Sequence, residues 1–452
     1  MALASAQETT RILRRLLASG MNARAERLLA RMRPADRGPV LSGLAPPELR
    51  TVIDLLFETE RAASTIRELP PDLLPDVFDA LGDERLAQIL TRLELDDRLE
   101  LVERLDDERR APVLALLPAS TRLELGKAEF YPPDSAGRAM VTSFVALPEE
   151  TTAQEAIDQI RSGAPDDEAV LYLYVVDDKQ RLRGTVPIRR LVAAKPERPC
   201  GELMVADPVS VRADADQEEV AQLVGRYNLL AIPVVDDEDR LLGVITVDDV
   251  IEVIHEEATE DIYHLAGLSD EDRVFSPARH AIRKRLPWMM LNLGAAFLAA
   301  RVIGLFEHAL EQVVTLAFFM PVVAGMGGNG GIQSLTVITR AIALGELEFS
   351  SGLRAIGKEI TVAIAIGAIT GVASGFVAWL WQGNPYLGVV LFTSMMATMV
   401  VAGVAGAAIP LLLQAFDQDP AVGSGVFVTT LTDIFGFTAF LGIGTLMLDR
   451  LG

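Results

Sequence analysis

The sequence has 452 residues, half of them apolar, yet it carries 63 acidic and only 41 basic residues. The charge is unevenly distributed, because residues 276–452 hold 9 basic and 9 acidic side chains. The whole net charge of −22 therefore lies before residue 276. This division is typical of a membrane protein with a large acidic soluble part, and it excludes a uniformly soluble protein.

The cysteine and histidine content excludes further classes. A single cysteine, Cys200, permits no intrachain disulfide, and the four histidines are scattered and predict no cluster for zinc or copper. No apolar stretch with a cleavage site begins the sequence, so we expect the acidic half to stay in the cytoplasm. An acidic surface repels nucleic acid and anionic lipid, which leaves small cations as its natural partners.

The first predicted region, residues 1–131, is helical. From about Thr9 to Lys127, apolar residues recur at three- and four-residue spacing, interrupted by Pro, Gly or Asp-Asp pairs. This pattern predicts a small stack of helical hairpins in which each helix buries one face on its neighbours. Most of these residues are expected to be scaffold.

Two repeats are predicted next, over residues 132–199 and 200–247. The segment 175–184, VVDDKQRLRG, matches the segment 234–243, VVDDEDRLLG, at a constant offset of 59 residues. Each copy combines an amphipathic helix, an apolar strand, an Asp-rich turn, a second strand and another helix. This order resembles a tandem pair of cystathionine-β-synthase (CBS) domains, which have an α/β fold.

The resemblance to CBS pairs implies one candidate nucleotide site. In that family the cleft between paired repeats often holds ATP or another adenosine nucleotide, contacted by a Thr and by an Asp three residues later. Thr246 and Asp249 fill those places in the second copy, whereas the first copy, TVPIRR from Thr185, has arginine instead of the acid. We expect one nucleotide site or, as the alternative, a purely structural pair.

An acidic connecting helix is predicted within residues 248–275. Positions 249, 252, 256 and 260 fall on one helical face, and positions 257 and 261 extend the neighbouring stripe. Like charges at this spacing destabilise an isolated helix. The face is therefore either solvated or occupied by divalent cations that compensate the repulsion.

Residues 276–452 predict a transmembrane domain of five helices. The apolar runs cover residues 286–306, 313–344, 358–381, 386–416 and 422–448. Each run is long enough to cross a hydrocarbon core of roughly 30 Å. The basic cluster from Arg279 to Arg285 places the start of the first span in the cytoplasm, so five crossings put the C-terminus outside.

The second predicted span is rich in glycine. Between Pro321 and Ser334 it holds five glycines, Gly328 among them, beside Asn329 and Gln333. So much glycine predicts irregular backbone, which at membrane depth lines a cavity or packs against protein. Close helix packing through small residues is the alternative. The two polar side chains favour an ion pathway.

The fifth predicted span contains an acidic residue near its middle, Asp433. A charge at that depth costs on the order of 3 kcal/mol, so an intramembrane carboxylate indicates a functional site. Hydroxyl oxygens of Thr429, Thr430 and Thr432 lie nearby in sequence. No His, Cys or Lys is available in the central membrane layer, so a cation is the expected partner of Asp433.

These features carry a resemblance over nearly the whole chain. The motif PVVAGMGGNGGIQ ending at Gln333, the stretch from Asp419 to Asp433 and the domain order resemble the MgtE family of magnesium channels and transporters. The resemblance implies a homodimer embedded in membrane lipid, whose second and fifth spans line the pore. It also implies that Asp433 holds a hydrated Mg²⁺ with Asn329 nearby. We expect the inner membrane of a prokaryote as the location.

The acidic half is expected to be a Mg²⁺ sensor. Mg²⁺ prefers oxygen ligands. At high cytoplasmic Mg²⁺, ions bound between the acidic faces would neutralise their repulsion and close the pore. The expected metal ligands are Glu94, Asp96, Asp97, Asp248, Glu252, Glu256, Glu257, Glu260 and Asp261 in the soluble part, and Asp433 in the pathway.

Two other function classes stay open. A proton-coupled secondary transporter would also use an intramembrane Asp, but it would normally show a second titratable relay group or an inverted repeat. A membrane-anchored nucleotide sensor would explain the CBS pair and leave Asp433 without a purpose. No phosphate loop, metal-binding His pair or nucleophile elbow indicates an enzyme. The sequence does not decide whether the protein is a channel or a carrier. It also leaves open how strictly Mg²⁺ is preferred over Mn²⁺, Co²⁺ or Ca²⁺.

Overall fold

The computed structural model describes residues 3–70, 73–163, 171–268, 278–347, 351–416 and 418–451. The chain forms two compact units, Met1–Ile254 and His255–Gly452. The end of the predicted connecting region, residues 269–275, lies outside the described residues.

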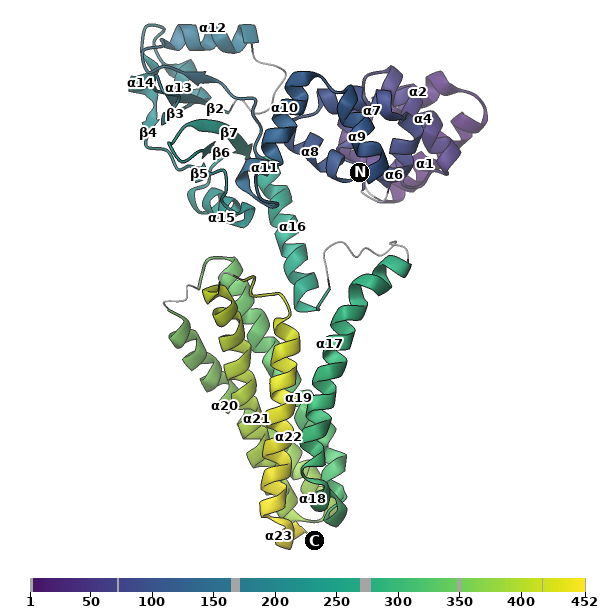
Figure 1. Cartoon of the computed structure of the whole chain (residues 1–452), viewed down its shortest axis with the longest axis vertical. Coiled ribbons are helices and arrows are strands. Elements are labelled where there is room, and N and C mark those ends of the chain that lie inside the picture. Colours follow the sequence, from purple (N-terminus) through teal and green to yellow (C-terminus); the bar gives the residue numbers. More distant parts are fainter. Residues whose placement is uncertain are drawn as a thin grey trace. The chain divides into compact units, whose positions relative to one another are not determined.

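Short helices build the N-terminal part of the first unit (Figure 1). They are α1 (Leu3–Ala18), α2 (Asn22–Ala30), α3 (Pro34–Leu41), α4 (Pro46–Glu58), α5 (Ala62–Ile66), α6 (Leu74–Leu81), α7 (Asp83–Arg92), α8 (Leu95–Glu103), α9 (Asp107–Leu116) and α10 (Ala119–Ala128). Proline at the first turn starts α3 and α4, because its missing N–H would be unpaired there in any case. Each helix contributes buried apolar side chains to one shared core. The predicted stack of helical hairpins is confirmed.

Two small sheets follow in the same unit. The first copy contains α11 (Ala136–Ala139), β1 (Ala146–Leu147), α12 (Ala153–Gly163), β2 (Tyr172–Val176), β3 (Leu182–Pro187) and α13 (Ile188–Ala193). The second contains α14 (Cys200–Leu203), β4 (Val205–Ala206), β5 (Val211–Arg212), α15 (Gln217–Tyr227), β6 (Ala231–Val235), β7 (Leu241–Thr246) and the start of α16 (Val247–Leu265), a helix that continues past Ile254 into the second unit. The sheet orders are β1-β2-β3-β4 and β5-β6-β7, with one parallel pair at the start of each. The expected tandem α/β pair is confirmed.

The repeated Asp-rich turns have a local structural purpose. Asp177 Oδ1 accepts the backbone N–H groups of Lys179 and Arg181, at 2.9 and 3.0 Å. Asp236 Oδ1 accepts the corresponding groups of Glu238 and Arg240, at 2.9 and 2.8 Å. Both carboxylates thus close the hairpin between two strands, as Asp commonly does in turns.

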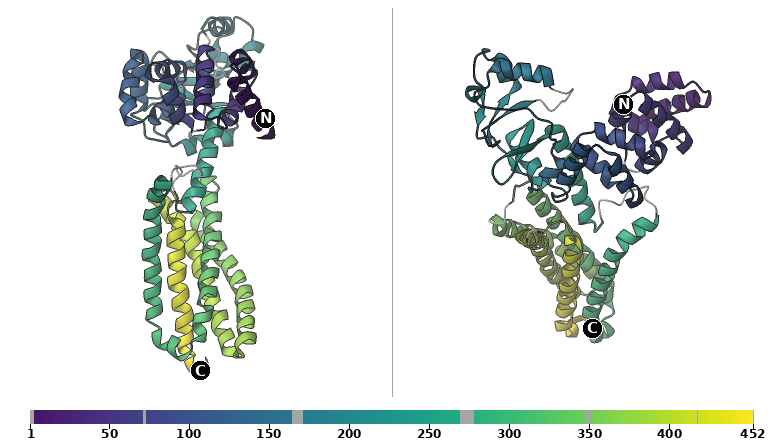
Figure 2. Two further views of the ribbon diagram at one scale, coloured as in Figure 1. Left: turned by 90° about the vertical axis from the view of Figure 1, so that its right-hand side faces the viewer. Right: turned by 45° about the horizontal axis from the view of Figure 1, so that its top comes forward.

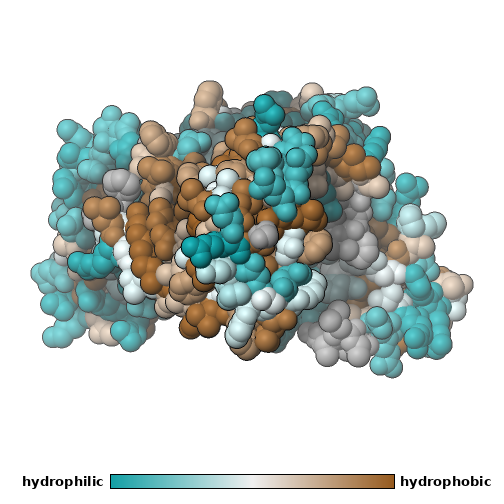
Figure 3. All heavy atoms as spheres, turned by 90° about the horizontal axis from the view of Figure 1, so that it is seen from below, coloured by the Kyte–Doolittle hydropathy of each residue, from teal (hydrophilic) through white to brown (hydrophobic). Residues whose placement is uncertain are grey.

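Long helices that run side by side form most of the second unit (Figure 2). They are α17 (Ala278–Gly304), α19 (Thr315–Ala343), α20 (Gly352–Gln382), α21 (Pro385–Ala415) and α22 (Ser424–Leu446), with short α18 (Glu307–Gln312) and α23 (Leu448–Leu451) beside them. Among the described helices, five are long and apolar enough to cross a membrane. In the space-filling view, apolar side chains in brown gather around a smaller polar patch (Figure 3). The prediction of five spans is confirmed.

The glycine-rich span departs from expectation, because α19 is continuous from Thr315 to Ala343. A Cβ added at Gly331 would lie 2.5 Å from Val428 Cγ1, and one at Gly327 would lie 2.6 Å from Thr398 Cγ2. A Cβ at Gly406 of α21 would lie 2.5 Å from the carbonyl oxygen of Gly331. The interpretation as irregular backbone is therefore wrong. These glycines allow α19, α21 and α22 to approach closely, as small residues do in membrane bundles.

Candidate ion pathway and metal sites

The packing of α19 against α22 fixes which residues share a level in the bundle. The two helices are antiparallel: Gly331 faces Val428, Gly327 faces Thr432, and Gly436 faces Val323. In the same register Asn329 lies level with Thr430. Asp433 is three residues beyond Thr430, which is about 4.5 Å along the axis. The structure thus brings Asn329, Thr430 and Asp433 within about one helical turn of one another in depth.

One face of α19 is left uncovered by the rest of the described chain. Asn329 and Gln333 are exposed on this face, and a Cβ added at Gly325 or Gly328 would meet no atom within 4 Å. The opposite face, with Gly327 and Gly331, is buried. On α22, Asp433 is half-buried, between the buried and the exposed sides. A single copy therefore presents these polar groups at the edge of its helix bundle.

The threonines of α22 have two different surroundings. Thr429 Oγ1 and Thr430 Oγ1 donate to the carbonyl oxygens of Gly425 and Val426, at 2.8 and 2.7 Å, so their lone pairs remain free to accept. Both residues are half-buried. Thr432 is fully buried and packs against Gly327 and Gly331. The Thr432 side chain is therefore enclosed within the bundle.

A second carboxylate within the spans was overlooked from the sequence. Glu359 of α20 is only 4% exposed. Its Oε2 accepts a hydrogen bond from Ser334 Oγ at 2.7 Å, and its Oε1 lies 3.0 Å from Lys358 Nζ. Ser334 lies on the buried face of α19, away from Asn329 and Gln333. The sequence signal for this carboxylate was the position of Glu359 inside the third predicted span.

A cluster of acids forms within the first unit. Asp96 and Asp97 of α8 lie near Asp249 of α16, with Arg67 between them. Arg67 Nη1 is 3.7 Å from Asp97 Oδ2, and its Nη2 is 3.5 Å from Glu68 Oε1. Asp96 Oδ1 is buried and has no hydrogen-bond partner among the described residues. Such an oxygen is costly unless it is protonated or meets a cation.

The pKa values in this cluster are raised. Burial, reinforced by the charges of Asp97 and Asp249, raises the pKa of Asp96 well above its usual range. Burial also raises the pKa of Asp97 to about 7, although Arg67 opposes the shift. The pKa values of Asp249 and Glu252 are raised mainly by burial as well. The folded unit thus disfavours the charged form of these carboxylates.

The predicted regulatory acids are divided between the two units. The charges of Glu94 and Glu100 both act on Asp97, so Glu94 belongs to the cluster. Glu100 was not among the residues predicted from the sequence. Asp248 Oδ1 instead accepts from Thr246 Oγ1 at 2.5 Å. Glu256, Glu257, Glu260 and Asp261 belong to the second unit. Nothing in the sequence distinguished Arg67 from the other basic residues of the helical region.

The candidate nucleotide residues are engaged elsewhere. Thr246 Oγ1 lies 2.6 Å from Asp249 Oδ2 as well as 2.5 Å from Asp248 Oδ1. Thr246 is buried, and Asp249 is close to Asp96 and Asp97. Asp249 is therefore better placed as a member of the acidic cluster than as a ribose contact.

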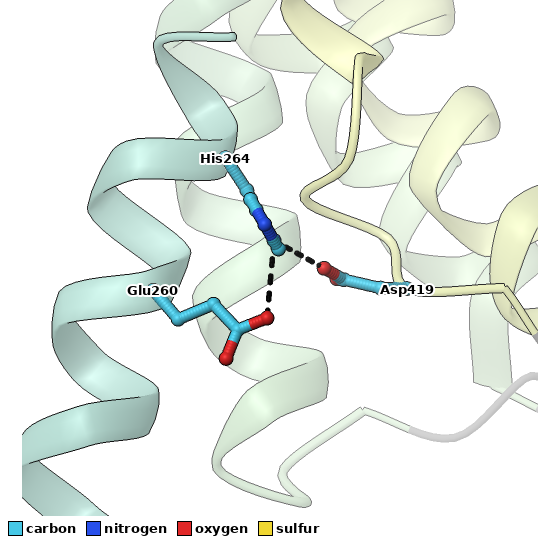
Figure 4. A group of neighbouring side chains, drawn as sticks. All are labelled: Glu260, His264 and Asp419. Carbon is cyan, nitrogen blue, oxygen red and sulfur yellow. Dashed lines mark hydrogen bonds and ion pairs between the residues drawn. The ribbon is translucent and has the colours of Figure 1, made fainter. Parts of the chain in front are cut away.

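A smaller group lies at the end of α16, entirely within the second unit (Figure 4). His264 Nδ1 is 2.8 Å from Asp419 Oδ2 and 3.6 Å from Glu260 Oε1. Burial and the charge of Asp419 raise the pKa of the adjacent Asp261. Sequence reasoning found Glu260 but missed His264 and Asp419. The spacing of four residues between Glu260 and His264 was the sequence signal that could have revealed His264.

Comparisons with known proteins decide the family. The model of the divalent cation transporter MgtE matches residues 320–443, that of the MgtE intracellular N domain matches 32–134, and that of CBS domains matches 136–197 and 200–256. The magnesium transporter MgtE of Bacillus subtilis (strain 168) is 40% identical over 322 residues, 71% of each chain. The chain belongs to the MgtE family of magnesium transporters. It is thus a transporter, as expected, and not an enzyme.

Further relatives agree with this assignment. The magnesium transporter MgtE of Thermus thermophilus is 38% identical over 322 residues, again 71% of each chain. The solved cytosolic domain of the Mg²⁺ channel MgtE in complex with ATP has a TM-score of 0.52 and 34% identity. That similarity covers 54% of this chain and 99% of the solved one. The family models thus match both the helical and CBS regions of this chain and its candidate membrane spans.

Proposed function

We propose that this MgtE-family transporter conducts Mg²⁺ along a path between α19 and α22, and that two copies are needed to enclose the path. The half-buried Asp433, within about one helical turn in depth of the uncovered Asn329, carries this proposal. An amide and a carboxylate at the edge of a bundle are costly against lipid. A second copy, placed by twofold symmetry, would cover both groups and present a second Asp433 to the same axis.

The chemistry of the proposed path suits Mg²⁺. This ion takes oxygen ligands in octahedral geometry and dehydrates reluctantly, so it keeps several waters as it passes. Asp433 supplies charge, and Asn329, Thr429 and Thr430 supply neutral oxygens to hydrated ions. Gln333 lies one helical turn beyond Asn329, and the open space at Gly328 leaves room for water. The half-buried carboxylate therefore acts as the main cation site.

The function of Asp433 is tested by Mg²⁺ uptake into liposomes that contain the purified protein. We expect Asp433→Ala to abolish uptake and Asp433→Asn to reduce it strongly, because the amide keeps an oxygen but loses the charge. Asp449→Asn, at an exposed acid in α23, is the matched control and should transport normally. Retained uptake by Asp433→Ala would contradict the assignment.

We further propose that the acidic cluster of the first unit senses cytoplasmic Mg²⁺. The unpartnered Asp96 oxygen and the raised pKa values of Asp97 and Asp249 support this, since a divalent cation would relieve both. Mg²⁺ bound there stabilises the state in which the acids lie together, and this state is the closed one. For the cluster to sense cytoplasmic Mg²⁺, the soluble half must lie in the cytoplasm, which puts the C-terminus outside.

An adenosine nucleotide at the CBS pair is a separate proposal. It is supported by the similar cytosolic domain that was solved in complex with ATP. The engagement of Thr246 with Asp248 and Asp249 argues against a phosphate contact from this hydroxyl. Equilibrium dialysis with ATP tests the proposal, and the absence of binding at millimolar ATP would exclude it.

A further inference from the structure

Glu359 of α20 is a buried carboxylate that the proposed path does not use. It is 4% exposed, and it lies in a helix that is long and apolar enough to cross a membrane. An acidic side chain in such a helix is by default a functional-site hypothesis, because its charge must find partners within the protein. Its Oε2 accepts a hydrogen bond from Ser334 Oγ of α19 at 2.7 Å, and its Oε1 lies 3.0 Å from Lys358 Nζ. The carboxylate thus ties α20 to α19.

Ser334 connects this carboxylate to the polar face of α19. Its side chain lies on the buried face of the helix, whereas Asn329 and Gln333 lie on the exposed face. The three residues belong to one continuous helix and lie within about two turns of it, so they move together. The distance of 2.7 Å is typical of a hydroxyl that donates to a charged carboxylate, which is a strong and directional bond. The bond therefore fixes how α19 is rotated about its own axis.

The middle of α19 has few side chains that could fix this rotation. Its contacts with α21 and α22 are made there by glycines: a Cβ added at Gly330 would meet Met399, and one at Gly331 would meet Val428. Glycines allow close approach but have no side chain to interlock with a neighbouring helix. A rotation of about 20° would move a group about 5 Å from the helix axis by roughly 2 Å. Groups that bind an ion must be held within about 0.5 Å, so the rotation of α19 matters for the path.

We propose that Glu359 is a positioning residue of the ion path, which sets the rotation of α19 through Ser334 and so places Asn329 and Gln333 toward the passing ion. This inference rests on the proposed path between α19 and α22. Oxygens at fixed positions distinguish ions by their size and hydration, and Mg²⁺ gives up its waters less readily than Ca²⁺. Loss of the bond therefore weakens the discrimination between these two ions.

Uptake of Mg²⁺ and of Ca²⁺ into liposomes that contain the purified full-length protein tests the proposal. We expect Ser334→Ala and Glu359→Ala each to lower the ratio of Mg²⁺ uptake to Ca²⁺ uptake by about tenfold. The double variant should lower it no further, because both changes remove the same bond. Glu359→Gln keeps an acceptor oxygen for Ser334 and should keep most of the ratio.

Thr361→Ala is the matched control. The Thr361 hydroxyl is exposed on the same helix and donates to the carbonyl oxygen of Gly357, one turn away, at 2.9 Å. This variant should transport both ions as the parent does.

The ratio separates positioning from general damage to the fold. A parental ratio in Ser334→Ala and Glu359→Ala would overturn the proposal, as would an equal loss of both uptakes. If Glu359→Ala cannot be purified, Ser334→Ala and Glu359→Gln decide, and the proposal requires a low ratio in the first and a nearly parental ratio in the second. Asp433→Ala distinguishes the two proposals: if it retains uptake, the proposed path fails, whereas an unchanged ratio beside an inactive Asp433→Ala rejects only the role of Glu359.

Discussion

Asp97 shows how burial changes the ionisation of an acidic side chain. The residue lies between Arg67, which favours its charge, and the acids Glu100, Glu94 and Asp249, which oppose it. Burial is the largest effect and raises the pKa of Asp97 to about 7. Near neutral pH the protonated and charged forms of this carboxyl are therefore close in free energy.

The raised pKa of Asp97 gives a pH dependence with a definite sign. The unfolded chain releases this proton near its ordinary pKa of 3.8, whereas the folded chain keeps it up to about 7. The folded state therefore loses stability as pH rises from about 4 to about 7, by about 1.4 kcal/mol for each tenfold difference in proton affinity. We expect the melting temperature of the full protein without divalent cations to fall across this range.

The matched variants for this prediction are Asp97→Asn and Asp178→Asn. Asp97→Asn should be more stable than the parent at about pH 8 without Mg²⁺, because its amide carries no charge to bury, and Mg²⁺ should stabilise it less. Asp178→Asn, at an exposed acid of a turn, should follow the parent. An unchanged pH profile in Asp97→Asn would show that this carboxyl is not the titrating group.

Single residues differed in how well the sequence could reveal them. Asp433 stands out in the sequence because a lone charge in an apolar run is itself unusual. Glu359 stands near the end of its span beside a lysine, so the sequence made it look like part of the boundary. Asp419 and Arg67 acquire their partners through the tertiary fold, Asp419 from α16 and Arg67 from α8 and α16. A linear pattern could not show these contacts.

At the scale of elements, α19 shows that glycine can serve packing without breaking a helix. The sequence indicated that this span was special and located it correctly. It could not decide between irregular backbone and close packing, because both use the same residues. The outcome depends on what lies opposite each glycine, and opposite Gly331 lie Val428 of α22 and Gly406 of α21.

Substitution of Gly406 tests the close packing directly. In Gly406→Ala the new Cβ would meet a backbone oxygen of α19, which cannot rotate away, so α19 and α21 must separate. We expect a loss of about 1–3 kcal/mol in stability, the usual cost of overpacking. Gly357→Ala in α20, where the added Cβ meets no atom within 4 Å, is the control and should be neutral or slightly stabilising.

The thermal stability of the two purified variants in detergent provides the measurement. Equal melting temperatures for Gly406→Ala and the parent would show that α19 and α21 accommodate the added methyl group without loss of stability. In that case the glycines would need another explanation.

At the scale of the whole molecule, the proposed path requires a second copy. The single buried cysteine allows a clean test in a Cys200→Ser background. We expect Asn329→Cys to form a disulfide-linked dimer in membranes under mild oxidation, because two copies of this position face one axis. Val372→Cys, on an exposed part of α20, should stay monomeric on a denaturing gel. A monomeric Asn329→Cys would argue against a shared path.

In the proposed mechanism, the apolar part and the acidic part of the sequence have different functions. The electrically neutral part supplies the spans and Asp433, and the acidic part supplies the cluster around Asp96 and Asp97. Neutralisation of that cluster by Mg²⁺ then favours the closed state over the open one. A ligand shifts such an equilibrium only through its different affinity for the two states.

Mg²⁺ current through the reconstituted protein, recorded while free Mg²⁺ is raised on the side of the soluble domains, tests this account most directly. We expect the current to fall as Mg²⁺ on that side rises into the millimolar range. In Asp97→Asn the fall should require a higher Mg²⁺ concentration. A current that does not respond to Mg²⁺ on the side of the soluble domains would contradict the account.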